Sequence, residues 1–216
     1  MPTPVTWLVR AAWTLLVTLS TACRAAHGIP RPPSYEDCVP THRFYHDLAA
    51  STEDMSAPGE VSSDPDVALD RVLDDLESQG IALVPKASGI EDWSKFTTTF
   101  PDTIFLGRDF PTWSVAERAE ILWHERVHVR EYERLGVERF LVVYAFAEGR
   151  WALEVQAYRE SFRVMRTFGI SEDVVLGLMR PRAESLYDNY DLDQMPRECA
   201  VQGAIDVWML DVESVP

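Results

Sequence analysis

The stretch HERVH, residues 124–128, decides how this sequence is interpreted, because it is an HExxH pattern between helix signals. Ser114 followed by Glu117 predicts a capping box at the start of a helix, and Gly136 predicts its end. The helix predicted over 114–135 therefore carries HERVH near its middle.

Helical geometry places the two histidines of HERVH on one face. Residues i and i+4 are only about 40° apart and one turn along the axis, so His124 and His128 can bind the same metal ion. Glu125 stands about 100° round the helix, where its carboxylate can take a proton from metal-bound water. The alternative is a solvated helix face on which two histidines align by chance. The flanking Leu122 and Trp123 favour a buried site.

A catalytic zinc site needs a third protein ligand, usually His, Asp or Glu after two histidines. The extended HExxHxxGxxH pattern is absent, since Glu131 and Arg134 stand where it has Gly and His. Two glutamates further along the chain, Glu148 and Glu154, therefore compete for this role.

Their expected positions favour Glu154. Glu148 precedes Gly149 at a predicted helix end, where a side chain is less well fixed. Glu154 lies inside the next predicted helix, and Ala157 lets that helix approach the HERVH helix closely. For both glutamates a solvent-facing helix carboxylate is the ordinary alternative.

The segment HERVHVREYERLGVERFLVVYAFAEGRWALEVQAYRE, residues 124–160, resembles a bacterial group of zincin-like metallopeptidases. That group has an HExxH helix, an aromatic-rich helix and a Glu-x-x-Ala helix with the third ligand, and it includes peptidase-like domains found with contractile injection systems. The resemblance covers residues 101–160. The chain departs from the pattern at Glu131, where such sequences tend to have Gln.

The resemblance implies roles for four residues. His124, His128 and Glu154 would bind Zn²⁺, and Glu125 would be the general base for peptide hydrolysis through a zinc-activated water. It also implies that a strand over residues 103–107 lies at the edge of the cleft, where an extended peptide could add to the sheet.

Two further parts of such a site have no clear assignment. The oxyanion donor has four candidates by chemistry alone, each more often structural than catalytic: Arg150, Tyr158, Tyr187 and Tyr190. A carboxylate that orients a ligand histidine is also expected, without a residue to name.

The remaining patterns predict an α+β fold that is mainly α. We expect a zincin-like arrangement, with a small edge sheet packed on the HERVH helix and several further helices. Helices are predicted over 64–80, 137–148, 150–168, from Ser171 onward with a kink or break at Pro181, and over 200–208, and short strands over 81–84 and 103–107.

The first residues predict export. Arg10, the apolar run over 11–19 and the small residues before Cys23 are typical of a secretory signal over residues 1–22. Simple cleavage after Ala22 and lipidation of Cys23 are both open, and lipidation is the only membrane attachment expected. A Pro-rich linker or arm is predicted over 23–63 and the folded domain over 64–216.

The charge, the cysteines and a second pair of histidines each bear on what this chain can bind or form. With 35 acidic against 20 basic residues the net charge is -15, which disfavours nucleic acid. Export would permit a disulfide between Cys38 and Cys199. His42 and His46 are also four apart, but Arg43 stands where HExxH has Glu, so a solvated arm is the better interpretation.

Three functions follow as hypotheses. The first is an exported, periplasmic or secreted zinc metallopeptidase that acts on a peptide or protein. The second is a catalytically inactive zinc-binding module that binds peptides or proteins. The third is a metal-free helical interaction domain whose acidic surface meets a basic partner.

Overall fold

The computed structural model describes residues 61–86, 96–190, 192 and 195–209. This part of the chain is mainly helical with a small three-stranded sheet, which confirms the predicted α+β, mainly α class. The predicted signal peptide, nearly all of the predicted arm, Cys38, His42 and His46 lie outside the described residues.

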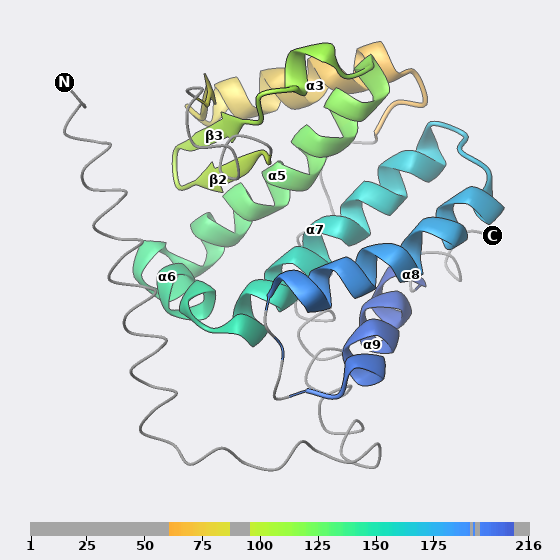
Figure 1. The fold of residues 1–216 in the computed structure, drawn as a ribbon. Helices are drawn as coiled ribbons and strands as arrows, with labels where there is room; N and C mark the ends of the chain where they lie inside the picture. The colour runs from red at the N-terminus through yellow and green to blue at the C-terminus, as the bar shows by residue number, and fades with distance from the viewer. Residues whose placement is uncertain (1–60, 87–95, 191, 193–194, 210–216) are drawn as a thin grey trace.

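The three strands come early in the described part of the chain, and the helices from residue 115 onward follow them (Figure 1). They are α3 (Pro65–Ser78), β1 (Ala82–Pro85), β2 (Thr98–Phe100), β3 (Thr103–Leu106), the 3-10 helix η3 (Phe110–Thr112), α5 (Val115–Leu135), α6 (Val137–Ala145), α7 (Ala147–Thr167), α8 (Glu172–Asn189) and α9 (Arg197–Met209).

The sheet has the order β1-β3-β2, with β1 parallel and β2 antiparallel to β3. The strand predicted over 103–107 is therefore central and paired on both sides, so the implied addition of a peptide to the sheet at this strand is wrong. The edge nearer to α5 is β2, in which Thr99 pairs with Ile104. Three residues are too short for an alternating pattern, which explains why the sequence did not predict β2.

The α5 helix begins and ends as predicted. The Ser114 hydroxyl accepts a hydrogen bond from the Glu117 amide at 3.2 Å, and the Glu117 carboxylate accepts one from the Ser114 amide at 2.8 Å. Gly136 follows the helix with φ 73°, a conformation that glycine adopts without strain. Caps at both ends fix which residues belong to this helix, and thereby the position of HERVH.

A first apolar core joins α3, the sheet and α5. It contains Val72 and Leu76 from α3, Ile104 from β3 and Leu122 from α5, all fully buried. Trp123 also belongs to this core and donates a hydrogen bond from Nε1 to the Ala68 carbonyl at 3.3 Å. One side of α5 is thereby held against α3 and the sheet.

The junction between α6 and α7 differs from the prediction. Gly149 was expected to separate two helices, but it lies in the first turn of α7, with Glu148 beside it. A Cβ at Gly149 would lie 1.9 Å from the main-chain oxygen of Val143 in α6. The glycine therefore permits close approach of two helix ends and does not end a helix.

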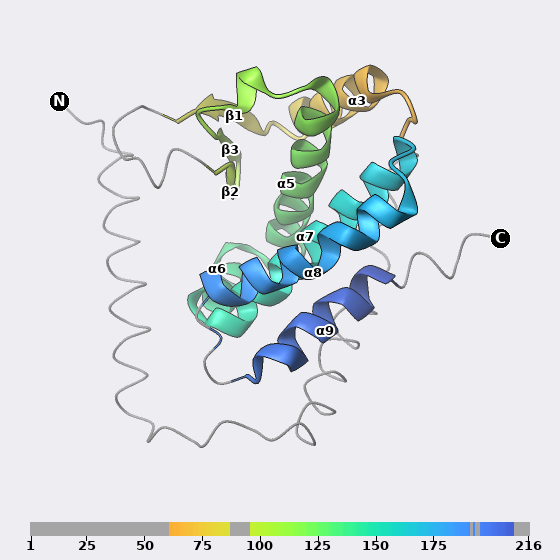
Figure 2. The ribbon, with the colours of Figure 1, turned by 45° about the vertical axis from the view of Figure 1, so that its right-hand side comes forward.

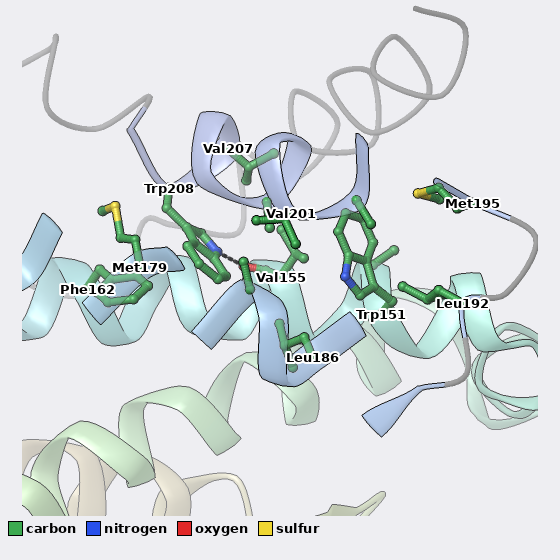
Figure 3. Close-up of a cluster of buried hydrophobic side chains, with 14 of the residues drawn as sticks. Trp151, Val155, Phe162, Met179, Leu186, Leu192, Met195, Val201, Val207 and Trp208 are labelled. Carbon is green, nitrogen blue, oxygen red and sulfur yellow. Dashed lines mark hydrogen bonds between the residues drawn. The ribbon is translucent and has the colours of Figure 1, made fainter. Parts of the chain in front are cut away.

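A second apolar core holds α7 against α8 and α9 (Figure 3). Trp151 and Phe162 of α7 are buried with Met179 of α8 and Trp208 of α9. The Trp208 indole donates to the Val155 carbonyl at 2.8 Å, which joins α9 to the middle of α7. This contact supports the backbone next to Glu154.

The C-terminal helices show two further outcomes. The structure has α8 as one helix through Pro181, so no division occurs there; the proline is exposed, where water can satisfy the carbonyl that loses its partner. Cys199 of α9 is disulfide-bonded. The other two cysteines of the chain, Cys23 and Cys38, lie outside the described residues, so the pairing with Cys38 stays a prediction.

Candidate metal centre

Three side chains from two helices meet at one point. Nε2 of His124 lies 3.3 Å from Oε2 of Glu154, and Nε2 of His128 lies 3.6 Å from Oε1 of the same carboxylate. One ligand atom from each residue falls within 4.8 Å of the others. Among the residues that the structure describes, this is the one such group that could hold a metal ion.

Helix packing brings these groups together. HERVH presents both histidines on the face of α5 that meets α7, and Figures 1 and 2 show the two helices side by side. Ala157, one turn after Glu154, is fully buried on α7. A small side chain there permits the close approach on which the choice of Glu154 depended.

The donor set suits zinc, because imidazole nitrogen and carboxylate oxygen are among its usual ligands. The second nitrogen of each ring also has a partner. Nδ1 of His124 lies 3.2 Å from the Ser161 hydroxyl, and Nδ1 of His128 lies 3.1 Å from a carboxylate oxygen of Glu131. These partners turn both Nε2 atoms toward Glu154, as metal-binding histidines require.

Glu131 is the orienting carboxylate that the sequence analysis expected without naming. It is almost fully buried, three residues after His128 on the same helix. Burial raises the pKa of Glu131, although the hydrogen bond from His128 opposes this rise. The signal in the sequence was its spacing from His128, which brings i and i+3 side chains together on a helix.

The charges of the centre favour a cation. Burial alone would raise the pKa of Glu154, but the hydrogen bond with His124 and the charge of His128 lower it to about 2. Burial alone would lower the pKa of His128, but Glu131 and Glu154 raise it to about 9. The acidic groups thus stabilise a positive charge at the centre.

Glu125 is buried and lies outside the three-residue group. Its carboxylate oxygen Oε2 accepts a hydrogen bond from the Thr99 hydroxyl at 2.7 Å. Thr99 is not among the residues predicted from the sequence, because its strand β2 has only three residues. The side chain of the proposed base is thus held by the edge strand of the sheet.

The four proposed oxyanion donors have different surroundings. The Tyr187 hydroxyl donates to the Met195 carbonyl at 3.1 Å, and Arg150 donates to main-chain carbonyls at the end of α6, so both have structural contacts. The Tyr190 hydroxyl donates to Oε1 of Glu154 at 3.0 Å. The Tyr158 ring meets the His124 ring edge-on, with 4.7 Å between their centroids.

A further tyrosine near the centre was missed from the sequence. Burial and the carboxylate of Glu154 raise the pKa of Tyr144 to about 12, with a smaller contribution from Glu125. The guanidinium of Arg150 lies 5.8 Å from the ring centroids of both Tyr144 and Tyr190. The two rings therefore lie near the same guanidinium, and the Tyr190 hydroxyl also donates to Glu154.

The competing glutamate has no part in this group. Glu148 lies in the first turn of α7, nearly two turns before Glu154, and the potential metal-binding group does not include it. Its spacing from Glu154 puts it on another face of the helix. The structure thus favours the glutamate that the packing argument preferred.

No family model, curated protein or solved structure matches the chain. Within the described part of the chain, no helix has the length and apolar character needed to span a membrane. The interpretation of the centre therefore depends on its own geometry.

Proposed function

We propose that this protein is a zinc-dependent peptidase with a zincin-like catalytic domain. The observation that carries the proposal is the convergence of His124, His128 and Glu154 beside a separate buried carboxylate, Glu125. A zinc ion bound by the three groups would act as a Lewis acid and lower the pKa of a bound water to roughly 7.

Glu125 is the proposed general base. It lies next to His124 in the chain but outside the ligand group, which leaves its carboxylate for proton transfer. The carboxylate takes the proton of the attacking water and returns it to the leaving amine. A peptide bond needs both transfers, because the amine is a poor leaving group until it is protonated.

The sheet supports a peptide as substrate. In the described part of the chain, β2 pairs with β3 on one side only, and its Thr99 contacts Glu125. An extended peptide added to the other side of β2 would lie near the proposed base. We therefore propose β2, in place of the strand over 103–107, as the strand that receives the substrate.

Export is the proposed location. The signal-like residues 1–22 support it, and the disulfide at Cys199 does so independently, because disulfides persist in oxidising compartments. Lipidation of Cys23 remains the proposed route to a membrane surface.

Zinc analysis combined with a peptidase assay tests this proposal. We expect about one zinc per chain in wild type. Glu125→Gln should keep the zinc and abolish hydrolysis of a fluorogenic peptide library, because it removes the base and leaves the ligands in place. Wild type without zinc, or a Glu125→Gln variant as active as wild type, would refute the proposal.

One observation keeps the inactive zinc-binding module as a second candidate. Two of the proposed oxyanion donors use their hydroxyls elsewhere, Tyr190 on Glu154 and Tyr187 on the Met195 carbonyl. Wild type that binds zinc and captures peptides without cleaving them would favour that function.

A further inference from the structure

Thr99 occupies an unusual position for a polar side chain. Successive side chains of a strand point to opposite faces, so Thr99 faces away from its neighbours Thr98 and Phe100. Its partner in the sheet, Ile104, is fully buried in the core between the sheet and α5. A strand position that faces a core usually holds an apolar residue, and the hydroxyl of Thr99 therefore needs an explanation.

The Glu125 carboxylate explains it. The Thr99 hydroxyl lies 2.7 Å from Oε2 of Glu125 and 3.4 Å from the main-chain oxygen of the same residue. A threonine hydroxyl has a single proton to donate, and the shorter contact identifies the carboxylate as its acceptor. Within the described residues, this is the one hydrogen bond that the Glu125 side chain receives.

We propose that Thr99 is a positioning residue, which holds one oxygen of Glu125 so that the other faces the reacting water. The inference rests on the proposed peptidase function and extends it. A glutamate has three rotatable side-chain bonds, and proton transfer requires hydrogen-bond reach to the water. A fixed carboxylate avoids the ordering that a free one would need at each turnover.

Lys86 holds the strand that carries Thr99 in place. Lys86 is buried directly after β1, and its ammonium donates to the Thr98 hydroxyl at 2.8 Å and to the Phe96 carbonyl. Both acceptors lie in or just before β2. The hydroxyl of Thr99 is thus held on a strand that is itself fixed, and a peptide paired with this strand would have a set position relative to Glu125.

Removal of the hydroxyl tests the positioning role. Thr99→Val keeps the shape of the side chain, and we expect kcat on a library-selected fluorogenic peptide to fall roughly 10- to 100-fold with KM and zinc content near wild type. Thr99→Ser keeps the hydroxyl and should restore most of kcat. Thr103→Val is the matched control, since that hydroxyl contacts Asp102. Unchanged kcat in Thr99→Val, equal losses in Thr99→Val and Thr99→Ser, or a change mainly in KM would overturn the role.

A second measurement needs neither zinc nor hydrolysis. In chelator, Thr99→Val should lower the melting temperature of wild type by about 2–5 °C and that of Glu125→Ala by clearly less, because the carboxylate acceptor is absent there and only the longer contact with the main-chain oxygen is left. Equal lowering in both backgrounds would overturn the contact. Wild type without hydrolysis would instead refute the peptidase and with it the positioning role, even if the melting temperatures show the contact.

Discussion

A buried carboxylate oxygen of Glu131 lies 3.1 Å from Nδ1 of His128, which leaves Nε2 of that ring to face Glu154. Both partners are on α5, one turn apart. The helix that supplies two proposed ligands thus also supplies the group that orients one of them. This arrangement makes Glu131 a part of the centre that never needs to touch the ion.

We expect Glu131→Leu to weaken zinc binding by roughly 10- to 100-fold, since the ring of His128 loses the acceptor that orients it. Glu131→Gln keeps an acceptor oxygen and should lose less. Glu133→Leu, an exposed glutamate on the same helix, is the control. Competition against a chelating dye measures the affinities. If Glu131→Leu and Glu133→Leu bind zinc equally well, the proposed orienting role is wrong.

Gly149→Ala should destabilise the protein by more than about 2 kcal/mol. The new Cβ would lie 1.9 Å from the Val143 oxygen, a backbone atom that cannot move without shifting α6 against α7. Gly177→Ala in α8 is the matched control, because its Cβ meets nothing within 4 Å, and it should be neutral or stabilising by up to about 1 kcal/mol. Urea unfolding of both variants measures this. Similar stabilities would show that the α6–α7 junction is looser than described.

Lys86 predicts a pH dependence of stability. Burial lowers its pKa from 10.5 to about 8, despite the nearby Glu125. At a pH between these two pKa values, Lys86 keeps its proton in the unfolded chain and has lost it in the folded one. The free energy of unfolding therefore rises with pH over this range.

Comparison with Lys86→Met isolates this effect. The stability of wild type relative to the variant should increase between pH 8 and pH 10, by on the order of 2 kcal/mol, as followed by urea unfolding. A difference that stays constant over this range would mean that the folded protein does not disfavour the charged lysine.

Local signals were enough to predict the bounds of α5 and the shared face of its two histidines. The capping box, the terminal glycine and the i, i+4 spacing all belong to one continuous segment of the chain. The choice of Glu154 used two premises: the small Ala157 three residues after it, which is buried as the packing argument requires, and a helix end at Gly149, which is wrong because Gly149 lies inside α7. The role of Thr99 could not be predicted from the sequence. Its contact with Glu125 joins residues 26 apart, and its strand has only three residues. Such contacts depend on how elements pack, which spacing within one segment does not show.

Glu131 is an intermediate case. Its spacing from His128 was visible in the sequence, yet it was noted only as a departure from a related pattern. Buried glutamates are uncommon, and nothing local distinguished this one from a solvated carboxylate. The prediction of a helix end at Gly149 was wrong for a related reason. Glycine ends a helix more often than it permits the close approach of two helices.

The zinc content of wild type beside Glu154→Ala and Glu148→Ala tests the central claim most directly. Both variants remove one glutamate from α7, but only Glu154 reaches the two histidines. After purification and dialysis, elemental analysis should find about one zinc per chain in wild type and in Glu148→Ala, and little in Glu154→Ala. Zinc retained by Glu154→Ala, or absent from wild type, would contradict the account.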